Sequence, residues 1–188
     1  MDTRPLLLQL RLRGRIADPT TPESETLTAA GHATVKGGRL VLSPAGRAAA
    51  DVEFAIAGDD RAGVATAYEQ FGPRNAELIR ICHDWQVRDG GHANDHRDHA
   101  YDWSVIDRLA GVDERTGPVI RRLGRRIAAF GDYRDRLRAA RTRVEAGEHD
   151  WFTSPRIDSY HTVWMELHEH LLVALGLDRA AETAENDR

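Results

Sequence analysis

The sequence predicts a mainly α-helical protein, in which a small N-terminal domain with one β-hairpin precedes a helical bundle. Three observations predict this class. Short aliphatic runs flank a Gly-Gly turn near residue 37, apolar residues recur at helical spacing through the C-terminal two thirds, and a polar Gly-Asp-Asp segment at 58–60 separates the two parts. We therefore expect domains at 1–57 and 58–178, followed by a frayed tail at 179–188.

Composition narrows the class of protein further. The 188 residues are 41% hydrophobic and 30% charged, which is enough apolar material to bury a core and excludes a disordered chain. Cys82 is the single cysteine, so an internal disulfide is excluded. No apolar run approaches the ~20 residues that a membrane-spanning helix needs, and Met1–Arg15 lacks the long apolar core of a signal peptide. We expect a cytoplasmic protein with no membrane partner.

The N-terminal domain divides at its prolines and glycines. Pro5–Ile16 is predicted to form a short amphipathic helix, because proline suits a first helical turn and Leu6, Leu7, Leu10 and Leu12 lie among arginines. Pro19 interrupts the chain, and Thr21 is the expected N-cap of a second short helix that Gly31 ends. A β-hairpin then follows, and its strands are Ala33–Val35 and Leu40–Leu42.

A further helix is expected from Ser43 to Phe54 or Ala57. The hairpin, its Gly-Gly turn and the exit phrase Leu40-Val41-Leu42-Ser43-Pro44-Ala45-Gly46-Arg47 resemble the winged-helix domain of bacterial MarR/PadR-like transcriptional regulators from actinobacteria. The resemblance covers residues 4–57. It implies a homodimer, a DNA partner and a regulatory function.

One part of the winged-helix pattern is missing. Such a domain places three helices before the wing, and the third enters the major groove. Here the chain between Gly14 and the hairpin is too short for two complete helices, and the helix that remains carries Glu23 and Glu25 but no Lys or Arg. Carboxylates oppose contact with phosphates. The resemblance is thus to a truncated domain, which either still contacts DNA or is retained for packing and dimerisation.

The second part of the chain reads as helices throughout. A Gly/His/Asp/Asn loop is expected at 89–98, and a loop containing Pro155 at 151–160. Helices are expected at 61–70, 73–87, 99–110, 118–130, 133–146 and 162–175. The arginines between Arg121 and Arg143 are expected to pair with neighbouring acids on a solvated face, or else to meet a phosphate-like anion.

Polar side chains on apolar helix faces predict a small-molecule pocket. At about 100° per residue, His161 and His168 fall on the same side of their helix as Trp164, whereas Glu166 and His170 point away. Buried imidazoles need partners, and aromatic walls with a few polar groups are typical of ligand sites. The residues expected to bind the ligand are Asn75, Trp85, Gln86, Tyr101, Tyr160 and Trp164.

Two hypotheses about function follow from this predicted pocket. In the first, the protein is a ligand-binding regulator of winged-helix type that senses a small, partly apolar metabolite in its helical domain. In the second, it is a small enzyme in which His161, His168 and Asp102 perform acid–base catalysis and the N-terminal domain no longer binds DNA. A non-catalytic partner subunit is a third class. The Glu166–His170 segment lacks zinc-helix spacing, and no nucleotide-binding loop appears, so we expect neither metal nor cofactor.

Overall fold

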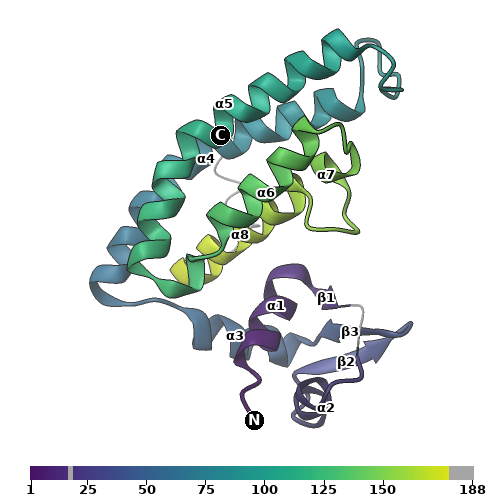
Figure 1. Ribbon diagram of the computed structural model, residues 1–188. Helices are drawn as coiled ribbons and strands as arrows, with labels where there is room; N and C mark the ends of the chain where they lie inside the picture. Colours follow the sequence, from purple (N-terminus) through teal and green to yellow (C-terminus); the bar gives the residue numbers. More distant parts are fainter. Residues whose placement is uncertain (17–18, 178–188) are drawn as a thin grey trace. The chain divides into compact units, whose positions relative to one another are not determined.

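The computed structural model describes residues 1–16 and 19–177, and it is mostly helical with one small three-stranded antiparallel sheet (Figure 1). Contacts group the chain into two compact units, which are described separately below. The first comprises Met1–Ala57 and the chain from His168 onward, and the second comprises Gly58–Leu167. Within the described ranges, no helix is both long enough and apolar enough to cross a membrane. The tail expected at 179–188 lies outside the described residues.

The helices of the first unit begin and end where local chemistry places them. Helix α1 (Arg4–Arg13) ends at Gly14, whose φ of 74° is in the left-handed region that glycine adopts without strain. Helix α2 (Pro22–Ala29) starts with a capping box, because the Thr21 and Ser24 side chains each accept the other's backbone N–H. Helix α3 (Pro44–Phe54) is capped by Ser43. The helix predicted at 5–16 therefore ends at Arg13, and residues 14–16 are not helical.

Those three residues include a strand that the sequence did not predict. Strand β1 (Arg15–Ile16) pairs with β3 (Arg39–Leu42), which also pairs with β2 (Ala33–Lys36), so that the order is β1-β3-β2. The predicted hairpin is confirmed, with Lys36 opposite Arg39 across a turn made by two glycines with positive φ. The third strand forms because Gly14 reverses the chain beside the open edge of β3.

The core of the first unit joins these elements. Buried side chains come from α1, α2, the hairpin and α3, and they are Leu7, Leu10, Leu27, Ala33, Leu40 and Ala50. Gly46 lies so close to the backbone of His32 that an added Cβ would be 1.9 Å from the carbonyl oxygen. The backbone N–H of Ile56 donates to the carbonyl of Ala174, which connects the end of α3 to the C-terminal helix.

In the second unit, two long helices lie side by side: α4 (Gly58–Gln86) and α5 (His99–Arg126) (Figure 1). The sequence predicted four shorter helices here, and this was wrong at two positions, because Pro73 and Pro118 lie inside continuous helices. The fixed φ of proline is itself helical, and what it loses is one backbone hydrogen bond. Burial of apolar side chains along the full length of both helices offsets that loss.

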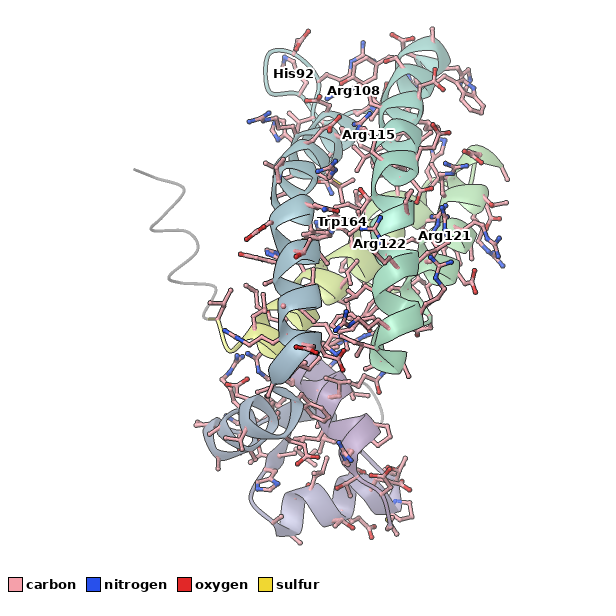
Figure 2. All side chains as sticks on the ribbon, turned by 90° about the vertical axis from the view of Figure 1, so that its left-hand side faces the viewer. His92, Arg108, Arg115, Arg121, Arg122 and Trp164 are labelled. Atoms are coloured by element: carbon pink, nitrogen blue, oxygen red, sulfur yellow. The ribbon has the colours of Figure 1, made fainter. Side chains whose placement is uncertain are left out.

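Three ion pairs connect α4 and α5 along their length. Arg126 pairs with Asp60 at 2.7 Å, Arg115 with Glu77 at 2.7 Å, and Arg108 with Asp84 at 2.7 Å. Figure 2 labels Arg108 and Arg115 on α5. These side chains are about half exposed, so each pair contributes at most about 1 kcal/mol to stability.

The remaining helices pack beside this pair. They are η1 (Ala128–Phe130), α6 (Tyr133–Glu145), α7 (Asp150–Thr153) and residues 160–167 of α8 (Tyr160–Leu175); α7 was expected to be loop. The predicted pairing of α6 arginines with acids is confirmed for Arg138 with Asp135, at 3.0 Å.

Helix α8 differs from its prediction in two ways. Residues 160–167 belong to the second unit, but residues from His168 on group with the first, whereas the sequence placed everything to residue 178 in the helical domain. In addition, Glu166 and His170, which were expected to point away from the core, are 9% and 3% exposed. A single apolar stripe was assumed for α8, but the helix is buried around most of its circumference.

Candidate functional site

The structure brings three of the predicted ligand-binding residues together inside the second unit. The indole Nε1 of Trp164 donates to Oδ1 of Asn75 at 3.0 Å, and the Tyr160 ring lies 6.0 Å from that of Trp164. The Tyr160 hydroxyl donates to buried Asp113 at 3.1 Å. Trp164 and Tyr160 are fully buried, and Trp164 also stacks on Phe71 at 4.6 Å. The polar atoms of Trp164 and Tyr160 therefore already have partners within the core, Asn75 and Asp113.

A second group forms around Asp102. Its carboxylate lies 3.1 Å from Nδ1 of His96 and accepts from the Asn94 side-chain amide at 2.9 Å, while that amide also donates to the Trp85 carbonyl at 3.1 Å. The His96 ring packs against that of Trp85 in a tilted arrangement, with 4.4 Å between the ring centres. His96 has a φ of 56°, a conformation that costs a non-glycine residue energy and is concentrated at functional sites.

Asp102 is thus paired with an imidazole, but not with either of the two predicted ones. His161 is half-buried, and burial lowers its pKa below the ordinary value of 6.5. His168 is buried and belongs to the other unit. The sequence analysis missed His96 because it assigned the 89–98 segment to a loop, although Asn94 and His96 lie within eight positions of Asp102.

The other two predicted residues have separate partners. The Tyr101 hydroxyl donates to the backbone carbonyl of Asp84 at 2.8 Å, and the Arg88 guanidinium lies 3.7 Å from the centre of the Tyr101 ring. Gln86 donates to Thr153 at 3.2 Å. The predicted residues therefore fall into distinct contact groups, and their role as ligand contacts stays a prediction.

The described residues were also compared with the requirements of a metal site and of a reactive thiol. No group of three or more His, Cys, Asp or Glu side chains in residues 1–16 and 19–177 is placed to share a metal ion. Cys82 is buried on α4, and burial raises the pKa of its thiol to about 12. A thiol with that pKa is protonated at neutral pH and is not a nucleophile.

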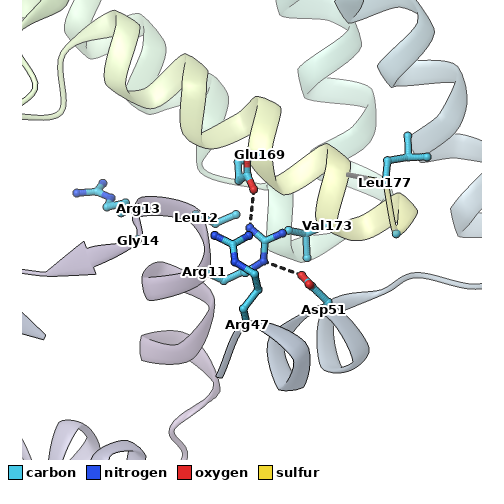
Figure 3. Close-up of a pocket in the computed structure, with 10 residues that line it drawn as sticks. Arg11, Leu12, Arg13, Gly14, Arg47, Asp51, Glu169, Val173 and Leu177 are labelled. Atoms are coloured by element: carbon cyan, nitrogen blue, oxygen red, sulfur yellow. Dashed lines mark hydrogen bonds and ion pairs between the residues drawn. The ribbon is translucent and has the colours of Figure 1, made fainter. Parts of the chain in front are cut away.

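A pocket of about 470 Å³ lies in the first unit, between α1, α3 and the end of α8 (Figure 3). Its volume is within the range of small-molecule sites. It combines three guanidinium groups, two carboxylates and several aliphatic side chains; the lining residues are Arg11, Leu12, Arg13, Gly14, Arg47, Asp51, Glu169, Val173, Gly176 and Leu177.

Arg11 organises the pocket. Its side chain is only 6% exposed; Nε donates to Asp51 at 2.6 Å and Nη1 to Glu169 at 2.5 Å. Burial alone would lower the pKa of Arg11, but hydrogen bonds and Coulomb attraction from Glu169 and Asp51 outweigh it and raise that pKa above its usual value. Arg11 is therefore a fixed cation that holds one oxygen of each carboxylate.

Arg47 stands in contrast to Arg11. It is exposed on α3, one helical turn before Asp51, and it makes no ion pair or hydrogen bond with the described part of the chain. Figure 3 shows its side chain extending from α3 toward Arg11 and Glu169. The pocket thus contains a guanidinium that is available to a ligand.

The sequence analysis did not predict this pocket. The only local indication of the pocket in the sequence was a cation, Arg11, next to the buried Leu10 of α1. The partners of Arg11 come from positions 40 and 158 residues away, and such long-range pairing leaves no local pattern.

Comparison with models of protein families, with curated proteins and with solved structures gave no significant match.

Proposed function

We propose that the protein is a ligand-binding regulator of winged-helix type, and that the pocket of the first unit takes its ligand. The observation that carries this proposal is the position of the pocket. Its walls are formed by α1 and α3, the same helices whose apolar faces pack on the hairpin that resembles a wing. A ligand that contacts Arg47 on α3 would thus act directly on the packing of the hairpin-bearing unit.

The tip of the hairpin supports contact with nucleic acid. Lys36 and Arg39 face each other across the two-glycine turn, both are exposed, and neither has an ion-pair or hydrogen-bond partner among the described residues. Two free cations at the end of a narrow ribbon suit the phosphate backbone or a minor groove. Helix α2, with two glutamates in its first turn, offers no such contact. The hairpin rather than α2 would carry the interaction.

A hairpin variant tests this proposal. We expect Lys36→Ala/Arg39→Ala to weaken binding to duplex DNA from upstream of the protein's own gene, and to reduce the salt slope of log K by about 1.8, because two phosphate contacts are lost. Fluorescence anisotropy between about 50 and 200 mM salt measures both quantities. The matched control is Arg80→Ala/Arg156→Ala, which removes the same charge from exposed positions in the second unit. Absence of DNA binding by the unaltered protein at low salt would contradict a DNA-binding regulator.

The alternative function is acid–base catalysis in the second unit. The observation that favours it is the Asp102–His96 contact, because a carboxylate on Nδ1 fixes the tautomer of an imidazole and orients its other nitrogen. Asp102 is 3% exposed, so this orientation is held inside the fold, whereas the His96 side chain is 25% exposed. This arrangement replaces the pairing with His161 or His168 that the sequence predicted.

Hydrolysis of p-nitrophenyl acetate tests the reactivity of this imidazole. We expect His96→Ala to lower the protein's rate constant by about 10²-fold, the usual contribution of an oriented base, and Asp102→Asn to lower it as well. His92→Ala is the control, since His92 is an exposed imidazole of the same loop. Equal rates for the His96 and His92 variants would exclude the hypothesis of catalysis by His96.

A further inference from the structure

We infer that the pocket of the first unit recognises a zwitterion with an apolar body, of the α-amino-acid type. This inference rests on the proposed use of that pocket as a ligand site, and it adds the chemical class of the ligand. Three features of the lining support it: a free cation, a carboxylate oxygen without a partner, and an aliphatic wall.

The cation and the carboxylate lie side by side. Arg47 and Asp51 are four residues apart on α3, where Cβ atoms are about 5–6 Å apart on one helix face. An Arg–Asp pair at this spacing can form an ion pair, but here Asp51 directs Oδ1 to the buried Arg11 at 2.6 Å. Arg47 and the Oδ2 atom of Asp51 consequently have no partner among the described residues.

The two groups match the two charges of an α-amino acid. The guanidinium of Arg47 can bind a carboxylate with two parallel hydrogen bonds, and Oδ2 of Asp51 can accept from an ammonium group. These charges are separated by a single carbon in an α-amino acid, which suits two groups held one helical turn apart. A simple anion would use Arg47 but would leave the two acids of the pocket opposed to it.

The rest of the pocket suits an apolar side chain. Leu12, Val173 and Leu177 supply aliphatic wall, and about 470 Å³ is ample for a large apolar amino acid. Gly14 and Gly176 add no side chain to the lining. Arg11 is already engaged by two carboxylates, so its role is to position Asp51 rather than to contact the ligand.

Calorimetry on the full chain tests this inference without DNA, so its outcome is independent of the DNA-binding experiment. The probes are L-leucine, L-isoleucine, L-valine, L-methionine, L-phenylalanine and L-tryptophan. For the tightest of these, we expect the analogue without the ammonium group and the analogue without the carboxylate each to bind about 10- to 100-fold more weakly, since each loses hydrogen bonds to a charged group. If none of the six binds, or if the analogue without the ammonium binds as tightly as the amino acid, the zwitterion assignment is overturned.

Two variants assign the recognition to Arg47. We expect Arg47→Gln to weaken binding of the amino acid at least about tenfold, through loss of a charge-assisted contact, and Arg47→Lys to restore part of it. Because Arg47 is exposed and has no partner in the described chain, these variants should unfold at the same urea concentration as the unaltered protein. Arg156→Gln, also exposed, is the matched control and should bind normally. Normal binding by Arg47→Gln would exclude this site.

Discussion

Replacement of Asp113 by alanine should destabilise the second unit by about 3–5 kcal/mol, the usual cost of removing one member of a buried charge group. Asp113 is 1% exposed in the middle of α5, and its carboxylate is contacted by Arg134 at 2.7 Å, Arg141 at 3.1 Å and the Tyr160 hydroxyl at 3.1 Å. Without it, the guanidinium of Arg134, 18% exposed, loses its counter-charge, Arg141 keeps only Glu145 at 3.2 Å, and the fully buried Tyr160 hydroxyl loses its acceptor.

Urea unfolding followed by circular dichroism measures this loss. Asp113→Asn keeps the size and an acceptor for Tyr160 and should lose less than the alanine variant. Asp135→Ala is the control, because Asp135 also pairs with an arginine but is 74% exposed, and it should cost less than about 1 kcal/mol. Similar losses for Asp113→Ala and Asp135→Ala would show that the buried group is not essential to stability.

Replacement of Trp164 by alanine should also cost about 3–5 kcal/mol, as large-to-small changes of buried aromatic residues do. Trp164 is fully buried, stacks on Phe71 and donates to Asn75. The variant leaves a cavity and an amide oxygen without its donor. If Trp164 instead lined an open ligand pocket, the same change would remove ligand contacts at little cost in stability.

Trp103→Ala is the matched control for this experiment, since that indole is 51% exposed on α5 and its removal should change stability by no more than about 0.5 kcal/mol. Trp164→Phe keeps the ring stack but not the indole donor, and should fall between the two. A Trp164→Ala variant as stable as Trp103→Ala would contradict a core role for Trp164 and favour a ligand contact instead.

The sequence predicted the elements whose signals are local. The hairpin was found from its glycine turn, and the helix after it from Ser43 and Pro44. Local signals also misled, because Pro118 was read as the start of a new helix. The apolar stripe of α5 in fact continues from Val105 through Val112 to Ile120, and Asp113 adjoins it. A continuous helix would have marked Asp113 as a buried charge.

The sites were less predictable than the fold, because their partners are distant in sequence. Arg11 meets Glu169, 158 residues away, and Arg136 meets Glu166 at 2.9 Å, 30 residues away. Helical-wheel arithmetic placed Glu166 outside, since it assumes that a helix has one buried side. The His96–Asp102 contact was within reach of sequence reasoning, because both residues flank one short loop, but the choice of imidazole depended on the loop conformation.

The cross-helix pairing of Arg108 with Asp84 also determines how α4 and α5 slide past each other. A helical turn is about 3.6 residues, so a slip of one turn toward the start of α4 would bring Arg108 opposite Arg80 in place of Asp84, and a slip the other way would carry it past Gln86, where α4 ends. The first of these alignments sets guanidinium against guanidinium, and the second leaves Arg108 without its acid. The attraction in the observed alignment is small, but its loss on one side and the repulsion on the other penalise both shifts, so the order of charges along α4 favours the observed antiparallel register.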